Sequence, residues 1–501
     1  MQNLFKKVLS ARVYDVAVVT PLDRAETLST QLGNHIFLKR EDLQPTFSFK
    51  IRGAANKVAG LNEAQRKAGV ICASAGNHAQ GVAISARHFG LKARVVMPVT
   101  TPQIKVDSVK RLGGEVILKG DSYSEAQAYC DQLVAETGGT FIHPFDDEDV
   151  IAGQGTIAHE LLQTNMRIDA VFVPVGGGGL ISGIASFLKE ISPQTLVIGV
   201  EPEDSDAMTR SVKKGKRIKL AEVGLFADGV AVQEVGKLTF KMAQHYVDDF
   251  VTVSTDEICS GIKAVYQDTR AILEPSGALA VAGLRKYLQT HPMSGKNLVA
   301  INSGANMNFE RLQFVAERTL VGEKQEALFA VTIPERPRAL RQLCELVIQD
   351  RNITELHYRL SGRDDAHIFV GVAIKSGVEA DSLSQTLDRH GFKNLDLTAN
   401  ELAKTHLRHM VGGKTAHAFD EVVYRFEFPE RPNALGNFLK IMGENWNISL
   451  FHYRSHGGDF GRVLVGFEIP PKDKKQFREF LTNIRYRYVE ETQNPAYHLF
   501  L

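Results

Sequence analysis

The chain has 501 residues, of which 44% are hydrophobic, 23% charged and 8% aromatic, a composition typical of a soluble globular protein with about two to four domains. Its 59 lysines and arginines nearly balance 58 aspartates and glutamates, so a dedicated nucleic-acid or anionic-membrane partner is not expected. No uncharged apolar run approaches the roughly 20 residues that span a bilayer, and the N-terminus lacks the pattern of a secretory signal. The cysteines Cys72, Cys130, Cys259 and Cys344 are widely spaced, which favours reduced thiols in a cytoplasmic protein and no metal site.

Short β-rich runs alternate with longer helical runs from about residue 13 to about residue 315. This alternation predicts an α/β fold with mostly parallel strands. Six runs have the composition of strands: residues 35–39, 70–73, 93–97, 170–175, 196–200 and 297–301. So many strands are more than a small module needs, and they suggest a catalytic body of two lobes with a cleft between them.

Lys50 is the first candidate for chemistry along the chain. It stands between Phe49 and Ile51, where a helical pattern begins. Apolar surroundings and the positive end of a helix both disfavour the ammonium form, so the pKa of this lysine should be lowered and its neutral amine could attack a carbonyl group. The stretch alone also fits a structural lysine with a buried stem, so its role depends on the rest of the chain.

Three of the predicted strands end in polar or glycine-rich loops, at residues 74–81, 176–179 and 302–306. Ligands of open α/β sheets bind beyond the carboxyl ends of the strands, so these loops could converge on one ligand. The second loop is a run of four glycines between a strand and a helix, whose backbone N–H groups could surround a phosphate. It is not a Walker loop, because no Gly-Lys-Ser/Thr follows, and it lacks the spacing of a dinucleotide-binding fingerprint.

The motifs Ser48-Phe49-Lys50, Ser74-Ala75-Gly76-Asn77-His78, the four glycines and Ser303-Gly304 occur in an order that resembles fold-type II pyridoxal-phosphate enzymes. Within that group the sequence is most similar to threonine dehydratases (threonine ammonia-lyases), and the resemblance covers nearly the whole chain. It implies a two-lobed α/β catalytic body like that of the tryptophan synthase β subunit, with pyridoxal 5'-phosphate as the cofactor.

The resemblance implies roles for residues of this sequence. Lys50 would bond covalently to the cofactor and then act as the base that removes the substrate Cα proton. Asn77 would hydrogen-bond the 3′ oxygen of the cofactor, and Ser303 would face its pyridine nitrogen. The cofactor phosphate would lie against the backbone N–H groups of Gly176, Gly177, Gly178, Gly179 and Leu180. The substrate carboxylate would be received by Ser74, Ala75, Gly76, Asn77 and His78.

A serine opposite the pyridine nitrogen bears on the type of reaction. A carboxylate there would keep the ring protonated and favour transamination, whereas a hydroxyl leaves the ring closer to neutral and favours loss of a β-substituent. The resemblance therefore implies a carbon–nitrogen lyase that deaminates L-threonine to 2-oxobutanoate and ammonia by β-elimination, the first step of isoleucine biosynthesis. Two alternatives stay open: a serine dehydratase or racemase of the same fold, and an amino-acid sensor that binds no cofactor.

Beyond residue 320 the chain repeats itself at a constant offset of 95 positions. Pro334-Glu335-Arg336-Pro337 returns as Pro429-Glu430-Arg431-Pro432, and His357-Tyr358-Arg359 returns as His452-Tyr453-Arg454. Each copy has the order of a βαββαβ-like, ferredoxin-like α+β module whose first helix starts at proline. The doubled tail resembles the ACT-like regulatory pair of biosynthetic threonine dehydratases.

The expected domains are a catalytic body at residues 1–315, a linker at 316–325, and ACT-like modules at 326–399 and 420–493. The resemblance implies inhibition by isoleucine, activation by valine and assembly as a homotetramer. Arg359 and Arg454 could bind the carboxylate of an effector, although arginines on an exposed strand are the more frequent case.

Other polar segments have weaker interpretations. Residues 39–42, Lys-Arg-Glu-Asp, are typical of a strand end whose charged tips meet solvent, and residues 146–149 of a solvated acidic loop. Asp228 lies where some relatives bind a divalent ion, but no metal is expected. Glu274 belongs to a turn near the site, and the sequence assigns it no role.

Overall fold

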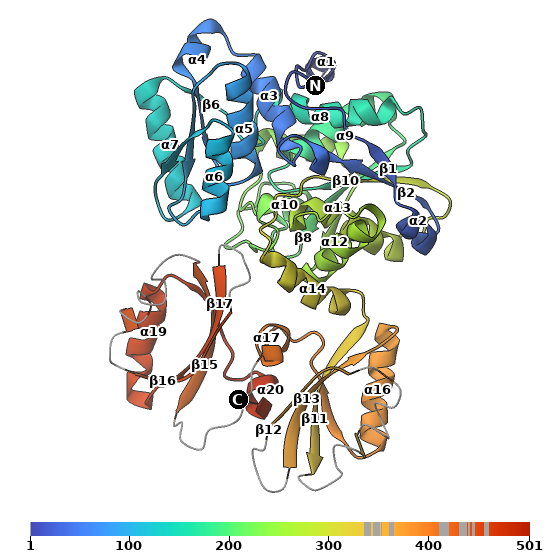
Figure 1. The fold of residues 1–501 in the computed structure, drawn as a ribbon, viewed down its shortest axis with the longest axis vertical. Coiled ribbons are helices and arrows are strands. Elements are labelled where there is room, and N and C mark those ends of the chain that lie inside the picture. The colour runs from blue at the N-terminus through green and yellow to red at the C-terminus, as the bar shows by residue number, and fades with distance from the viewer. Residues whose placement is uncertain are drawn as a thin grey trace. The chain divides into compact units, whose positions relative to one another are not determined.

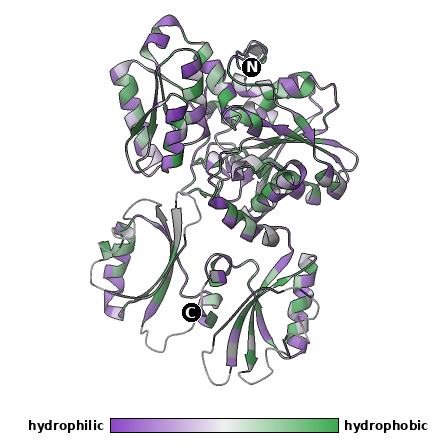
Figure 2. Cartoon of the chain, in the orientation of Figure 1, coloured by the Kyte–Doolittle hydropathy of each residue, from purple (hydrophilic) through white to green (hydrophobic). Residues whose placement is uncertain are grey.

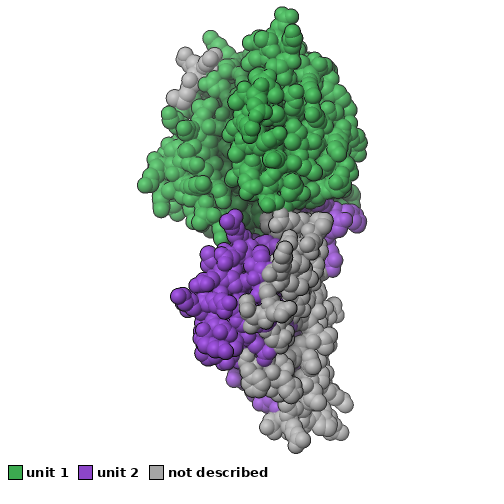
Figure 3. Space-filling view, turned by 90° about the vertical axis from the view of Figure 1, so that its left-hand side faces the viewer, with its two compact units in different colours: residues 1–307 green, residues 308–501 purple. Residues whose placement is uncertain are grey.

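The computed structural model describes residues 2–334, 342–343, 351, 353–359, 365–409, 420–429, 438, 441–442, 446–454 and 460–500. The chain forms two compact units, unit 1 at residues 1–307 and unit 2 at residues 308–501 (Figure 3). Among the described helices, none combines the length and the apolar character needed to cross a membrane.

Unit 1 contains a six-stranded sheet in the order β1-β2-β10-β7-β8-β9 (Figure 1). Neighbouring strands are parallel except for β1 and β2. The strands are β1 (Leu22–Arg24), β2 (His35–Arg40), β7 (Ala170–Pro174), β8 (Leu196–Pro202), β9 (Asp249–Val253) and β10 (Asn297–Asn302).

Helices cover both faces of this sheet, which explains why its inner strands are continuously hydrophobic. On β7, Val171 and Val173 share a cluster with α8 and α9, while Phe172 between them meets Tyr287 of α13. The helices of this lobe are α1 (Gln2–Leu9), α2 (Glu26–Leu32), α8 (Glu148–Leu162), α9 (Gly179–Ile191), α10 (Ala207–Lys214), α11 (Lys237–Tyr246), α12 (Thr255–Thr269) and α13 (Pro275–Thr290), with the 3-10 turns η1 (Glu41–Leu43) and η2 (Asp228–Val230). In Figure 2 hydrophobic and hydrophilic residues alternate along these helices, as expected of helices with one buried face.

A second, all-parallel sheet in the order β5-β4-β3-β6 forms the other lobe of unit 1. Cys72 of β3 packs with α3, α5 and α6, whereas its neighbour Ile71 packs with α7, because successive side chains of a strand point to opposite faces. The elements are α3 (Lys50–Ala59), α4 (Glu63–Ala68), β3 (Val70–Ala73), α5 (Asn77–His88), β4 (Ala93–Met97), α6 (Gln103–Arg111), β5 (Glu115–Leu118), α7 (Tyr123–Thr137) and β6 (Thr140–Phe141).

All six strands predicted for the body are present within two residues of their expected limits. The additional strands β1, β5, β6 and β9 are two to five residues long and are not buried throughout, so they lack the hydrophobic run that marks an inner strand.

Unit 2 contains two four-stranded antiparallel sheets, β12-β13-β11-β14 and β16-β17-β15-β18. Both have the strand order of a ferredoxin-like module. The strands are β11 (Glu326–Pro334), β12 (Ile353–Arg359), β13 (Asp365–Ala373), β14 (Lys393–Asp396), β15 (Glu421–Pro429), β16 (Asn447–Arg454), β17 (Phe460–Glu468) and β18 (Arg487–Glu490). The helical elements are α14 (Arg311–Gly322), α16 (Gly377–Arg389), α17 (Glu401–Thr405), η4 (Leu407–His409), η5 (Pro471–Asp473), α19 (Lys474–Asn483) and α20 (Pro495–Phe500).

The two modules agree in register as well as in strand order. An irregularity between Ile353 and Glu355 in β12 recurs between Ile448 and Leu450 in β16, at the offset of 95 seen in the sequence. The first helix expected in each module lies mostly outside the described residues. The predicted duplication is therefore present in the backbone pairing itself.

Each module buries both faces of its sheet. On β11, Phe329 and Val331 pack under α16, while Leu328 and Ala330 join a second cluster with Val423 and Leu464 of the other module. The short helices α17 and α20 complete that second cluster. The two modules are consequently joined by one apolar core that neither could close alone.

Candidate active site

Lys50 is the first residue of α3, and its side chain is half-buried. Its amine Nζ donates a hydrogen bond to the carbonyl oxygen of Pro144 at 3.0 Å and lies 5.2 Å from the centroid of the Phe49 ring. Removal of water from around the amine lowers the pKa of Lys50 to about 8, although the charge of Glu274 acts in the opposite direction. The amine is therefore partly neutral slightly above neutral pH, as a nucleophile or base requires.

Four glycines join β7 to α9, where the phosphate cradle is expected. Gly178 has a φ of 94° and is the N-cap of α9, with no side-chain cap. The first N–H groups of a helix have no partner within the helix, so those of Gly179 and Leu180 are available to an anion at its positive end. A Cβ on Gly177 would come within 2.3 Å of the Phe145 ring, so the loop has no room for a side chain there. This donor set fits a phosphate group.

The loop from Ser74 to Gly76 connects β3 to α5, and Asn77 is the first residue of that helix. A Cβ on Gly76 would meet nothing within 4 Å, so open space adjoins this turn. The ring nitrogen Nε2 of His78 lies 2.8 Å from the carbonyl oxygen of Ile142. Burial, with a contribution from the charge of Lys50, lowers the pKa of His78 to about 3, so the imidazole is neutral and does not itself supply a positive charge.

Ser303 directly follows β10 and is buried. Its Oγ lies 3.1 Å from the carbonyl oxygen of Ser276, to which the hydroxyl donates. Its own carbonyl oxygen accepts from the N–H of Phe49 at 3.1 Å, next to Lys50 in the chain. The serine thus belongs to the surroundings of the lysine.

The segment at Pro144 and Phe145 connects Lys50 to the glycine loop. Pro144 accepts the hydrogen bond of the Lys50 amine, and the Phe145 ring packs on Gly177. Because these two residues are adjacent, the lysine and the cradle lie on either side of one short segment. Ser303 after β10 contacts Phe49 next to Lys50, and Asn306 contacts Asn77 after β3, so the loops that follow β3, β7 and β10 share neighbours within unit 1.

Glu274 and Asn306, to which the sequence analysis assigned no role, also contact the site through Asn77. Glu274 is 5% exposed, and its Oε1 accepts hydrogen bonds from Asn77 Nδ2 at 2.7 Å and from Ser276 Oγ at 3.1 Å. Burial, with a contribution from Asp228, raises the pKa of Glu274 to about 7. Asn306 Nδ2 donates to Asn77 Oδ1 at 2.7 Å. The one sequence feature that could have indicated Glu274 is its position as a lone carboxylate among apolar residues, Ile-Leu-Glu-Pro.

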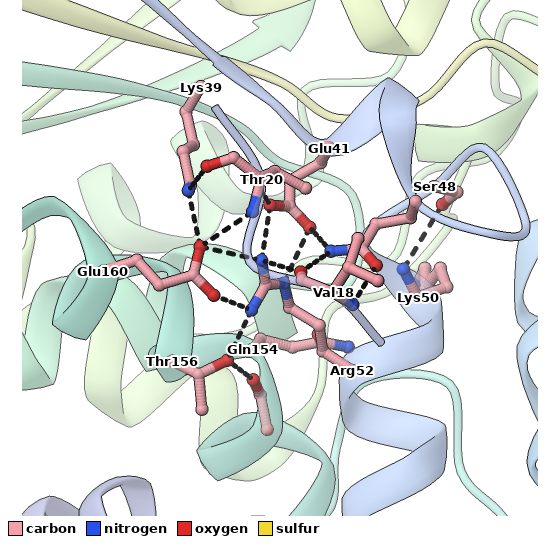
Figure 4. A network of polar contacts seen from close by, with 12 residues as sticks. Val18, Thr20, Lys39, Glu41, Ser48, Lys50, Arg52, Gln154, Thr156 and Glu160 are labelled. Carbon is pink, nitrogen blue, oxygen red and sulfur yellow. Dashed lines mark hydrogen bonds and ion pairs between the residues drawn. The ribbon is translucent and has the colours of Figure 1, made fainter. Parts of the chain in front are cut away.

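A buried ion network surrounds the first turns of α3 (Figure 4). Arg52 contacts Glu41 at 2.7 and 2.8 Å and Glu160 at 2.5 and 3.0 Å, and Lys39 contacts Glu160 at 2.5 Å. All four side chains are nearly inaccessible to solvent. The interpretation of residues 39–42 as solvated tips is wrong, because all four of these side chains are buried. Lys39 and Glu41 pair with residues of α8 and α3, and Arg40 pairs with Asp42 and Asp23. The network ties β2, α3 and α8 together next to Lys50.

The acidic run at residues 146–149 is also more than a solvated loop. Asp147 accepts hydrogen bonds from two N–H groups at the start of α8, and Asp146 accepts three at the start of α11. Asp228 pairs with Lys105 at 2.9 Å. Across the described residues, no three acidic, histidine or cysteine side chains form a group suited to a metal ion.

The fold and these residues define a fold-type II pyridoxal-phosphate-dependent enzyme. Residues 13–304 match the family described as pyridoxal-phosphate dependent enzymes, and residues 317–407 and 412–501 each match the C-terminal regulatory domain of threonine dehydratase. The chain belongs to the biosynthetic threonine dehydratase family. Membership of this enzyme family removes the support for a sensor that binds no cofactor.

Relatives and solved structures agree with this assignment. The chain is 55% identical to L-threonine dehydratase biosynthetic IlvA of Burkholderia multivorans over 503 residues, covering 100% of this chain and 99% of that protein. It is 49% identical to the Escherichia coli IlvA over 497 residues, covering 99% and 96%. The processed form of threonine deaminase isoform 2 from Solanum lycopersicum matches 63% of this chain and 87% of its own, with a TM-score of 0.63 and 49% identity. Maize serine racemase matches 64% and 97%, with a TM-score of 0.59 and 32% identity.

Proposed function

We propose that this enzyme converts L-threonine to 2-oxobutanoate and ammonia, the first step of isoleucine biosynthesis. The names of its full-length relatives support this substrate. The observation that carries the proposal is a lysine with a lowered pKa at the point where the loops after β3, β7 and β10 share neighbours. That arrangement supports attachment of a carbonyl cofactor and proton abstraction by the same amine.

Each group of the site then has a distinct task. Pyridoxal phosphate, when bound, supplies the electron-withdrawing system that makes the Cα proton of an amino acid removable. The amine of Lys50 would hold the cofactor and, as a base, would take up the Cα proton of the substrate. The backbone N–H groups of residues 176–180 bind the phosphate, and residues 74–78 receive the substrate carboxylate.

Ser303 supports elimination over transamination in this proposal. Its hydroxyl carries no negative charge to hold a proton on the ring nitrogen, and the hydrogen that it now donates to the carbonyl oxygen of Ser276 could turn to a neutral ring nitrogen. The electron pair left at Cα would then form the Cα–Cβ double bond as the threonine hydroxyl takes a proton from an acid and leaves as water. Water completes the reaction by releasing ammonia and leaving the 2-oxo acid.

The test combines the visible spectrum of the purified protein with an assay for 2-oxobutanoate. We expect a visible band of lysine-bound cofactor that changes when threonine is added, with formation of 2-oxobutanoate. Lys50→Ala should abolish the lysine-bound band and reduce turnover by at least roughly 10²–10⁴-fold. Lys57→Ala, on the same helix but paired with Asp147, serves as the matched control and should retain both. A colourless wild-type protein that leaves threonine unchanged would contradict the proposal.

We also propose that the tail regulates the enzyme, with isoleucine as inhibitor and valine as activator, in a cytoplasmic homotetramer. The matches to a regulatory domain and the two modules joined by a shared core support this reading. The proposed limits are residues 1–315 for catalysis, 316–325 for the linker, and 326–399 and 420–493 for the modules. An effector must bind two conformations with unequal affinity, and a region separate from the catalytic unit can do so.

Removal of the tail tests this second proposal. A chain that ends at Gly322, the last residue of α14, should keep the visible band and threonine turnover but lose its response to isoleucine and valine. Equal inhibition of the shortened and full-length proteins would exclude regulation by the modules. A sedimentation measurement on both proteins reports whether the modules contribute to the tetramer.

Serine is the second candidate substrate, because the 32% identity to maize serine racemase extends over the catalytic unit. Parallel assays with L-threonine, L-serine and D-serine would separate the two. Faster turnover of L-threonine supports the first proposal, whereas interconversion of the serine enantiomers supports the alternative.

A further inference from the structure

Glu274 and Asn306 bind the two ends of the Asn77 side-chain amide. Asn77 Nδ2 donates to Glu274 Oε1, and Asn306 Nδ2 donates to Asn77 Oδ1, each at 2.7 Å. The Asn306 nitrogen also donates to the carbonyl oxygen of Thr46 at 2.8 Å. The three side chains form a continuous chain of hydrogen bonds that begins at a backbone carbonyl and ends at a buried carboxyl group.

The chemistry at each end determines which way the two amides point. A backbone carbonyl oxygen can only accept, so the Asn306 atom that faces Thr46 is the nitrogen, and its second hydrogen points to Asn77. Asn77 therefore turns its oxygen to Asn306 and its nitrogen to Glu274. The partners thus assign oxygen and nitrogen in both amides, which the shape of an amide alone does not do.

Glu274 can accept from Asn77 in both of its protonation states. Burial and the charge of Asp228 raise the pKa of Glu274 to about 7, Lys105 acts in the opposite direction, and Glu274 in turn acts on the amine of Lys50. An ionised carboxylate accepts at both oxygens, and a protonated carboxyl still accepts at its carbonyl oxygen. The hydrogen bond therefore persists through the titration of the group.

We propose that Glu274 and Asn306 are positioning residues that orient the Asn77 amide so that its remaining Nδ2–H is offered to the cofactor. The inference rests on the proposed function and on the role that the family resemblance implies for Asn77, a hydrogen bond to the 3′ oxygen of pyridoxal phosphate. Glu274 accepts one hydrogen of Asn77 Nδ2, and Asn306 donates to Asn77 Oδ1. The second hydrogen of Nδ2 is then left for the 3′ oxygen of the cofactor. A donor stabilises the ionised oxygen, and the acid–base midpoint of the bound cofactor therefore depends on both residues.

The test follows the visible absorption of the full-length holoenzyme against pH, with kcat and KM for threonine measured in parallel. Loss of a hydrogen bond to a charged oxygen should raise the midpoint of Asn77→Ala by about one to two pH units. Glu274→Ala frees the amide to rotate and should place the midpoint above that of Glu274→Gln, which loses the same charge but keeps the hydrogen bond to Asn77.

Two substitutions separate orientation from mere packing. Asn306→Asp introduces a group that only accepts from Asn77, so the amide should rotate, offer its oxygen to the cofactor and shift the midpoint as far as Asn77→Ala does. Glu274→Gln removes the charge of Glu274 but keeps an acceptor oxygen for Asn77, so it should not raise the midpoint. Glu203→Gln, at an exposed ion pair of unit 1, is the control.

The possible results differ clearly. If Asn77→Ala moves the midpoint but Asn306→Asp does not and Glu274→Ala only matches Glu274→Gln, the positioning role is wrong. A midpoint unchanged in Asn77→Ala also overturns the inference, but leaves the proposed function intact as long as Lys50→Ala abolishes turnover. Wild-type protein that takes up no pyridoxal phosphate overturns both. If Glu274→Ala does not fold, Asn306→Asp at its half-buried position decides alone.

Discussion

The two units of the chain differ in how they arrange their buried charged side chains. Unit 1 encloses charged groups around its candidate site, including the fully inaccessible Arg52 and Glu41 and the carboxyl group of Glu274. The modules of unit 2 have mainly apolar cores; there the buried Glu326 pairs with Arg408, and the Arg351–Glu379 ion pair is partly exposed. Burial of a charge is costly unless it is paired, so the shared network of Lys39, Glu41, Arg52 and Glu160 beside Lys50 indicates selection for a fixed site geometry.

A second contrast lies within unit 2, where one backbone plan has two different cores. The main core of the first module consists largely of aliphatic residues, whereas Phe426, Trp446, Phe467 and Phe477 belong to that of the second. Strand order and register are nevertheless the same. The modules show that the pattern of buried positions specifies a fold while the identity of the buried side chains can diverge.

The largest effect should come from removing one partner of the buried network in unit 1. Arg52→Met leaves two carboxylates, Glu41 and Glu160, without their shared cation, and should destabilise the protein by about 3–5 kcal/mol. Urea denaturation followed by circular dichroism and by the visible band measures the loss. Arg351→Met, which breaks the partly exposed pair in unit 2, should cost less than about 1 kcal/mol. Equal losses would remove the contrast between the units.

The aromatic core of the second module should be more sensitive to truncation than its aliphatic counterpart. Phe467→Ala opens a cavity next to Phe477 and Phe480, whose ring centroids lie 5.1 and 6.2 Å away, and should cost about 3–5 kcal/mol. Val372 occupies the equivalent position 95 residues earlier, and Val372→Ala should cost about 2 kcal/mol. Denaturation of the two full-length variants compares them, and a larger loss in Val372→Ala would contradict the expectation.

The glycine loop offers a smaller and more local test. Gly177→Ala places a Cβ within 2.3 Å of the Phe145 ring and should cost about 1–3 kcal/mol, with weaker binding of pyridoxal phosphate. Gly60→Ala is the matched control, since its Cβ would lie 3.6 Å from the nearest atom at a φ of −80°. Titration of the apoenzyme with cofactor and thermal unfolding give the two readouts. Unchanged cofactor affinity in Gly177→Ala would argue against a close-fitting cradle.

The pH dependence of stability should report on His78 in unit 1. The folded-state pKa of His78, about 3, lies below the unfolded value near 6.5. The stability that depends on a neutral imidazole is therefore fully present above pH 6.5 and is lost as the pH falls toward 3. Between pH 7 and pH 5 the free energy of unfolding should fall by about 2 kcal/mol through this residue. His78→Gln should remove that part of the slope, whereas His390→Gln, on the surface of unit 2, should keep it. If the free energy of unfolding changes with pH equally in wild type and in His78→Gln, burial does not hold the imidazole neutral.

Short-range signals explain what could be predicted of the site. Lys50, Asn77, the four glycines and Ser303 each stand in a compact motif at the end of a strand or the start of a helix, and such motifs depend only on nearby residues. Glu274 and Asn306 lie 197 and 229 positions from Asn77, and no local pattern links them. The solvated interpretation of Glu41 failed although Arg52 is only 11 positions away, because the two side chains meet only when α3 packs beside η1.

By itself the sequence determined the alternation of strands and helices in unit 1, the lysine and glycine motifs, and the duplication of the tail. These features follow from hydrophobic periodicity and from contacts between close neighbours in the chain. Only the tertiary structure decided which charges are buried together and which way the amide of Asn77 points. Both depend on hydrogen-bond partners that remote segments supply, and burial makes those partners obligatory.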